Sequence, residues 1–273
     1  MNDPFELLLF TTDPQLIRDA VAAGIDGFIV DWERQGKERR QFDNDTEINR
    51  DTVEDLRVVR ACCKDALVIC RINGNGFTRN EEIEQALAAG ADELLLPMVT
   101  TVEEVELVLD VISNRARLGI LVETCEAVRL AKQLARLPLS RVYVGLNDLS
   151  IQRGDPNIFT AVSDGTVERA LEPFEVPIGF GGLTLPELGD PIECRLLMGE
   201  MRRLGCGFSF LRRSFRRDIQ NRNISAAITR IRQHLETASH RSSEVIRQER
   251  CELHDAIQAW KPPTLAITPN ERL

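Results

Sequence analysis

Short apolar runs that alternate with amphipathic stretches predict an α/β fold with mainly parallel strands. Eight runs of strand character occur, at residues 7–10, 27–30, 66–70, 93–99, 118–122, 141–145, 176–180 and 208–211. They lack the polar alternation of a strand with one face in water, so helices are expected to cover both faces. With 273 residues and 43% hydrophobic content, the chain is long enough to build one large α/β domain with a sizeable core.

The amphipathic stretches between these runs carry helix start and stop signals. Asp13–Pro14 places a capping oxygen before a proline suited to the first helical turn, and Gly24 is placed to end that helix. Asp190–Pro191 repeats this pattern before IECRLLMGEMRRLG, which predicts another helix start. Thr101 and Glu104 fit a capping box around the start of VEEVELVLDVI.

Eight strand and helix units predict a (β/α)8 TIM barrel with additional C-terminal helices. A doubly wound open sheet is the competing architecture, but it should carry a glycine-rich phosphate turn after its first strand, and LLLFTTDPQ has none. We expect a catalytic barrel over residues 1–213, a helical segment over 214–260 that completes it, and a tail over 261–273. The thin apolar stripe of the helical segment would be poorly buried in a monomer, so we expect a homo-oligomer.

Composition narrows the classes of partner. A net charge of −9 argues against general affinity for nucleic acid or an anionic membrane, although the local cluster FLRRSFRRD can still serve a small anion. No segment resembles a signal peptide or a transmembrane span, so we expect a cytoplasmic protein. The seven cysteines show no CxxC spacing, which predicts mostly buried, reduced thiols rather than a zinc site.

In a barrel of this kind, the chemistry takes place at the carboxyl ends of the strands. Polar residues and glycines directly after the apolar runs are therefore candidates for the site. They are Asp31, Glu33, Arg71, Asn73, Glu123, Thr124, Asn147, Asp148, Gly181, Gly182, Thr184, Arg212 and Arg213.

Glu123 and Asp148 follow adjacent strands at similar depth, which would bring two carboxylates within reach of one hard cation. Mg²⁺ or Mn²⁺ would be bound in this way, with water and substrate oxygens completing the coordination, and other divalent metals remain open. The alternative is that each carboxylate caps a helix or pairs with an arginine. The spacing alone does not decide between the two interpretations.

Four motifs carry a resemblance to a known family. RINGNG, ALAAGADELLLPMVTTVEEVE, LVETCEAV and GLNDLS occur in order, with barrel spacing, between about residues 7 and 155. Together they resemble the HpcH/HpaI aldolase and citrate lyase β-subunit family, divalent-metal enzymes of the phosphoenolpyruvate/pyruvate barrel superfamily. The resemblance implies that Glu123 and Asp148 are metal ligands and that Arg71 holds the carboxylate and carbonyl oxygens of a 2-oxo acid.

Two departures leave the branch of the family open. Aldolases of the family usually carry a histidine base after the second strand, where this chain has DWERQGKERR. Asp31 and Glu33, followed by Lys37 and Arg40, look more like the citrate lyase and malyl-CoA lyase branch, whereas GLNDLS is closer to the aldolase branch. The other departure is GFGGLTLPELGDP with FSFLRRSF, whose glycines and arginines sit where barrels commonly bind a phosphate or carboxylate.

The leading functional hypothesis is a metal-dependent carbon–carbon lyase or aldolase acting next to a 2-oxo acid such as pyruvate or oxaloacetate, through an enolate. Candidate groups for the proton transfer are a water on the metal, Asp31 and Glu33. Expected substrate contacts are Arg71, Asn73, Thr124, Gly181, Gly182, Arg212 and Arg213. The alternatives are a lyase acting on a CoA thioester of the citryl-CoA or malyl-CoA type, and an inactive barrel serving as a binding or scaffold subunit.

Overall fold

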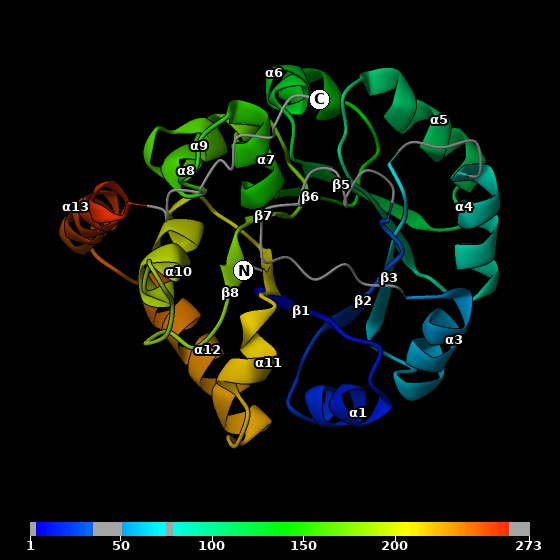
Figure 1. Ribbon diagram of the computed structural model, residues 1–273, viewed down its shortest axis with the longest axis horizontal. Helices are drawn as coiled ribbons and strands as arrows, with labels where there is room; N and C mark the ends of the chain where they lie inside the picture. Colours follow the sequence, from blue (N-terminus) through cyan, green and yellow to red (C-terminus); the bar gives the residue numbers. More distant parts are fainter. Residues whose placement is uncertain (1–3, 35–50, 75–78, 262–273) are drawn as a thin grey trace, which may run out of the picture.

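The structure, a computed structural model, describes residues 4–34, 51–74 and 79–261, in which nine parallel strands curl into a nearly closed barrel (Figure 1). The strands are β1 (Glu6–Phe10), β2 (Gly27–Asp31), β3 (Leu67–Arg71), β4 (Glu93–Leu96), β5 (Arg117–Val122), β6 (Arg141–Val144), β7 (Ile178–Phe180), β8 (Gly182–Leu183) and β9 (Phe208–Leu211). Their order, β7-β6-β5-β4-β3-β2-β1-β9-β8, follows the chain around the barrel. This confirms the predicted (β/α)8 architecture and excludes the doubly wound sheet.

The strand expected at 176–180 is confirmed as β7, but a further short strand, β8, which the sequence did not predict, follows it at Gly182–Leu183. β7 pairs with β6, and β8 pairs with β9. Gly181 lies between them with φ of 56°, a backbone conformation that L residues rarely adopt. A side chain on Gly179 would meet the Phe208 carbonyl oxygen of β9. Glycines therefore let the chain change partners and close the barrel.

The helices surround the strands in Figure 1. They are α1 (Pro14–Ala22), α3 (Val53–Cys62), α4 (Arg79–Ala88), α5 (Val102–Ile112), α6 (Cys125–Leu134), α7 (Leu146–Arg153), α8 (Thr160–Ser163), α9 (Thr166–Leu171), α10 (Cys194–Arg203), α11 (Ser214–Asp218), α12 (Ile224–Ser239) and α13 (Ser243–Ala259). Two predicted starts are confirmed: Asp13 caps α1, and Thr101 with Glu104 forms the capping box of α5. Gly24 follows α1 with φ of 86°, as a helix stop requires.

The helix start predicted at Asp190–Pro191 is wrong. α10 begins at Cys194, and the Asp190–Pro191 peptide bond, which is cis, lies in the turn before it. The N–H groups of Cys194 and Arg195 donate to the carbonyl oxygens of Leu188 and Pro186, at 2.8 and 2.9 Å. Backbone carbonyls of the turn thus satisfy the first N–H groups of α10, and no side chain caps this helix.

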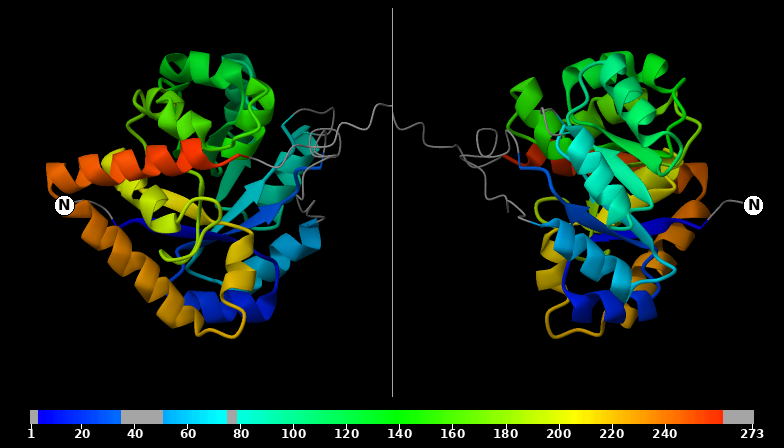
Figure 2. Two further views of the ribbon diagram at one scale, coloured as in Figure 1. Left: turned by 60° about the vertical axis from the view of Figure 1, so that its left-hand side comes forward. Right: turned by 90° about the vertical axis from the view of Figure 1, so that its right-hand side faces the viewer.

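The last two long helices have different surroundings. α12 packs between α10 and α1 and so completes the ring around the barrel. α13 lies outside this ring against α10 and α8, as Figures 1 and 2 show. The domain limits and the homo-oligomer remain predictions, and the tail after residue 261 lies outside the described residues. In the part of the chain that the structure describes, no helix combines the length and apolar character needed to cross a membrane.

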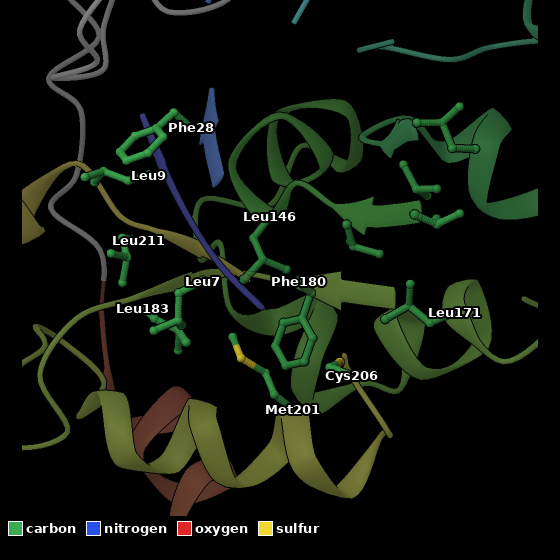
Figure 3. Close-up of a cluster of buried hydrophobic side chains, with 14 of the residues drawn as sticks. Leu7, Leu9, Phe28, Leu146, Leu171, Phe180, Leu183, Met201, Cys206 and Leu211 are labelled. Carbon is green, nitrogen blue, oxygen red and sulfur yellow. The ribbon is translucent and has the colours of Figure 1, made fainter. Parts of the chain in front are cut away.

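The apolar core has two parts, one between the sheet and the helices and one inside the barrel. Figure 3 shows part of the first, where Leu146 of α7 lies in the same buried cluster as Phe180 and Met201. The barrel interior holds Leu8, Ile29, Ile69, Leu95, Leu121, Tyr143, Phe208 and Phe210. All seven cysteines are free and four are buried, as expected for thiols that mostly pack in the core, and their reduced state remains a prediction.

Candidate active site

Arg71 ends β3 and is held by two carboxylates, that of Asp31 at the end of β2 and that of Glu33 just after it. Asp31 is its register partner on the neighbouring strand. Nε and Nη2 of Arg71 donate to the two carboxylate oxygens of Asp31, at 2.9 and 2.7 Å. Nη1 lies 3.2 Å from Oε2 of Glu33, and the guanidinium carbon lies 5.3 Å from the ring centroid of Phe10. These contacts fix the plane of the guanidinium at the carboxyl end of the barrel.

Arg71 is buried and stays charged. Burial alone would lower its pKa, but the charges of Asp31 and Glu33 and the hydrogen bonds to Asp31 hold the pKa above the usual value. Behind this pair, the Asp31 backbone N–H donates to Oδ2 of Asp51 at 2.9 Å. Burial, joined by the charges of Asp31 and Asp55, raises the pKa of Asp51.

Glu123 follows β5 and is a deeply buried carboxylate, 4% exposed. Its Oε2 accepts the N–H of Met98 at 3.2 Å. Burial, then the charges of Asp148 and Glu33, raises its pKa to about 8, although Arg71 and the Met98 N–H act in the opposite direction. Neighbouring carboxylates therefore concentrate negative charge around Glu123.

Asp148, in the first turn of α7, adds its carboxylate to those of Glu123 and Glu33, and it is 9% exposed. The turn is anchored by Leu146, whose Cδ1 would lie 3.5 Å from a Cβ atom built on Gly181. Gly145 stands at the N-cap of α7, directly after β6, and its N–H donates to the Val122 carbonyl oxygen. The apolar anchor and the short turn bring Asp148 to the end of β5, where Glu123 lies.

The donor set fits a hard divalent cation. Glu123 and Asp148 offer carboxylate oxygens, the ligands that Mg²⁺ and Mn²⁺ prefer. Among the described residues no group of three or more His, Cys, Asp and Glu side chains is arranged to hold a metal. Two protein carboxylates with water and substrate oxygens are the usual arrangement for Mg²⁺, which keeps several exchangeable positions.

The structure gives Asn73 and Thr124 contacts within the protein. Asn73 donates from Nδ2 to Glu82 at 2.9 Å, and its Oδ1 accepts the N–H of Arg34 at 2.9 Å. The Thr124 hydroxyl caps α6 by accepting the Ala127 N–H, and it donates to the Val99 carbonyl oxygen. These bonds tie the loops after neighbouring strands together, and a direct contact of either residue with substrate remains a prediction.

The candidates after β7 and β9 also have local contacts. The Gly181 carbonyl accepts hydrogen bonds from the hydroxyls of Tyr143 and Ser209. A Cβ atom on Gly182 would lie 2.5 Å from Cβ of Arg212. Nη2 of Arg212 lies 3.6 Å from Oδ2 of Asp218, which also accepts the Thr184 hydroxyl, and Arg213 is exposed. Substrate binding by this group remains a prediction, and Lys37 and Arg40 lie outside the described residues.

Four residues that the sequence analysis did not select complete the site. Phe10, Asp51, Met98 and Gly145 each contact Arg71, Asp31 or Glu123. Phe10 and Gly145 end apolar runs and Met98 lies within the run at 93–99, so their positions along the strands could have drawn attention to them, whereas Asp51 has no such signal.

The fold and the site define a (β/α)8 barrel whose mouth joins an arginine to a group of buried carboxylates. The chain belongs to the HpcH/HpaI aldolase/citrate lyase family, whose model matches residues 6–157. No curated protein matches it.

Solved structures with the same fold are similar to the chain. The citrate synthase SbnG is 18% identical, with 85% of this chain and 94% of that chain covered and a TM-score of 0.56. RipC from Yersinia pestis is 14% identical, with 89% and 98% covered and a TM-score of 0.52. At these identities the likeness shows the fold alone.

Proposed function

We propose that the protein is a divalent-metal-dependent carbon–carbon lyase or aldolase that forms or cleaves a bond next to a 2-oxo acid such as pyruvate or oxaloacetate. Membership of the family supports lyase or aldolase activity in general. The observation that carries the metal dependence is the environment of Glu123, a buried carboxylate beside Asp148 and Glu33 whose pKa is raised to about 8. A divalent cation, with twice the charge of Arg71, would strongly stabilise such a group of carboxylates.

Arg71 would bind the 2-oxo acid. Asp31 occupies the edge of the guanidinium formed by Nε and Nη2, and Glu33 contacts Nη1. Each Nη nitrogen carries a second hydrogen, and these two are suited to the carboxylate and carbonyl oxygens of the substrate. Because the carboxylates already fix the guanidinium plane, little reorganisation is needed when the substrate arrives.

Cleavage beside a 2-oxo acid leaves an enolate, and negative charge develops on its oxygen. A divalent cation held by Glu123 and Asp148 would supply Lewis-acid stabilisation of that charge. Arg71 adds a fixed positive charge that its surroundings keep protonated. Binding of substrate oxygens and stabilisation of the enolate would thus come from the same end of the barrel.

The proton acceptor in the cleavage direction must come from groups other than histidine. The three histidines stand at or after residue 234, far along the chain from the strand ends that form the mouth. Both oxygens of Asp31 already accept bonds from Arg71, so we assign Asp31 to holding the arginine. Glu33 or a water molecule is left to take the hydroxyl proton.

Proton exchange at C3 of pyruvate tests the proposal without knowledge of the acceptor. In D₂O with Mg²⁺ or Mn²⁺, the protein should catalyse loss of the pyruvate methyl signal in the proton NMR spectrum, because the enolate picks up deuterium. Excess chelator should stop the exchange, and added metal should restore it. Exchange that proceeds equally well with chelator would contradict metal dependence.

A CoA thioester lyase is the second candidate, because Asp31 and Glu33 occupy the position after β2 where a histidine base would stand. Such an enzyme should exchange the methyl protons of acetyl-CoA and show saturable CoA binding. An inactive barrel should catalyse neither exchange and bind neither Mn²⁺ nor an oxo acid. The same NMR experiment, run with both substrates, therefore separates the three classes.

A further inference from the structure

Gly145 lies where the side chain of Glu123 leaves no space for a Cβ atom. A Cβ atom built on Gly145 would lie 2.6 Å from Cγ and 2.9 Å from Cδ of Glu123, and closer still to Oε1. Real Cβ atoms essentially never approach other heavy atoms this closely. All three of the nearest atoms belong to Glu123, so the missing side chain serves this one residue.

The backbone gives no other reason for a glycine here. Gly145 has φ of −83° and ψ of 101°, a conformation open to every L residue. It occupies the N-cap of α7 without a side-chain hydrogen bond, although serine, threonine or aspartate would cap the helix better. The chain therefore lacks a better cap at this position. The contacts explain the glycine by the space that the Glu123 side chain needs.

Met98 contacts the same carboxylate from the opposite neighbouring strand. Met98 follows β4 with φ of 54°, which is uncommon for a residue with a side chain, and its N–H donates to Oε2 of Glu123. Because β5 lies between β4 and β6, the carboxylate is enclosed from both sides. A hydrogen bond fixes one oxygen, and the Gly145 backbone limits where the other oxygen can move.

We infer that Gly145 is a positioning residue. It sets the orientation of the Glu123 carboxylate for a divalent cation that Glu123 shares with Asp148. The inference rests on the proposed function for the metal, but the contact between Gly145 and Glu123 can be tested without it. Residues that orient a metal ligand typically change metal affinity by about 10- to 100-fold when they are altered.

The matched control is Gly119, at the opposite end of the barrel. A Cβ atom on Gly119 would lie 2.8 Å from Cγ of Arg141 and 2.9 Å from Oε1 of Glu93. Gly119→Ala therefore crowds a buried carboxylate as Gly145→Ala does, but far from the mouth. Both substitutions should lower stability, whereas only Gly145→Ala should weaken Mn²⁺ binding.

The test combines Mn²⁺ titration calorimetry with a double-mutant cycle on unfolding, using the full chain. Gly145→Ala should raise the Mn²⁺ dissociation constant at least about tenfold, and Gly119→Ala less than about twofold. In metal-free protein, Gly145→Ala should lower stability in the wild-type background and cost little in a Glu123→Ala background, because the crowding atoms are gone. If Gly145→Ala does not fold alone, the double variant should fold.

The outcomes separate the inference from the proposed function. Wild-type Mn²⁺ affinity in Gly145→Ala, or the same stability cost in both backgrounds, overturns the positioning role. Wild-type protein that binds no Mn²⁺ overturns the proposed metal site, and the stability cycle alone then decides whether Gly145 positions Glu123.

Discussion

The two ends of the barrel both bury charged side chains, but they balance the charges differently. At the amino end, Arg141 donates to Glu93 at 2.6 Å and to Glu6 at 2.8 Å, and Arg117 lies 3.8 Å from Glu93. At the mouth, Glu123 stands beside two further carboxylates, Asp148 and Glu33, with Arg71 as the opposing charge.

The difference separates a cluster whose charges are paired from one with an excess of carboxylates, which we propose to be the metal site. Burial raises the pKa of Glu93, while Arg141 acts to lower it through its charge and its hydrogen bond. For Glu123 two carboxylates reinforce the effect of burial, and its pKa rises to about 8. A buried charge without adequate compensation costs several kcal/mol, so the mouth is the end that gains most from an added cation.

The largest contrast is expected from exchanging the arginine at each end for lysine. Arg71→Lys keeps a charge but cannot contact Asp31, Glu33 and substrate with one planar fork, so pyruvate exchange should fall at least about tenfold. Arg141→Lys should lower the free energy of unfolding and leave the exchange rate of the folded protein near that of wild type. NMR exchange and urea unfolding measure both effects, and unchanged exchange in Arg71→Lys would remove it from the site.

The pH dependence of stability should follow the raised pKa of Glu123. The pKa of Glu123 is about 8 in the folded state against an ordinary value of 4.5, so the folded protein keeps a proton that the unfolded chain has released. The stabilisation that this bound proton gives the folded protein is fully present below 4.5, the pKa in the unfolded chain. It is lost as the pH rises through about 8, the pKa in the folded protein. Metal-free protein should therefore lose stability between about pH 5 and pH 8.

Urea unfolding with chelator at several pH values measures this loss. Glu123→Gln should flatten the dependence, and Mg²⁺ should raise the stability of the wild type most strongly above pH 8, where the carboxylate has lost its proton. The same slope in Glu123→Gln as in wild type would show that other groups cause the pH dependence.

The smallest expected effect concerns the aromatic rings that face the two arginines. Phe10 lies 5.3 Å from the Arg71 guanidinium carbon, and Phe208 lies 4.8 Å from that of Arg141. A cation–π contact contributes at least about 0.5–1 kcal/mol, and the loss of that much should slow pyruvate exchange in Phe10→Leu by roughly two- to fivefold. Phe208→Leu should lower stability only. Equal exchange rates in the two variants would show that Phe10 does not help to hold Arg71.

Local patterns in the sequence were sufficient for most of the fold. The capping box at Thr101 and Glu104 predicts α5 because its hydrogen bonds form within one turn. The break at Gly181 depends on pairing with β9, a strand that lies about 30 residues later in the chain, so no local pattern announces it. The start of α10 was missed for a similar reason, because backbone carbonyls replace the expected side-chain cap.

In the candidate site too, local patterns predict some residues, whereas others depend on contacts between segments that are distant in the chain. Arg71 and Glu123 each follow or end an apolar run, so their place at the mouth could be predicted from strand position. Gly145 and Met98 matter through contacts across neighbouring strands, which spacing along the chain does not encode. Asp51 is tied to Asp31 through a backbone N–H, a contact that leaves no mark in the residue pattern.

Calorimetric titration of Mn²⁺ into the wild type, Glu123→Gln and Glu93→Gln tests the difference between the two ends most directly. We predict that the wild type and Glu93→Gln bind Mn²⁺ with similar affinity, and that Glu123→Gln has a dissociation constant at least about tenfold higher, equivalent to about 1.4 kcal/mol. Equal affinity in all three proteins would contradict the assignment of Glu123 to a metal site.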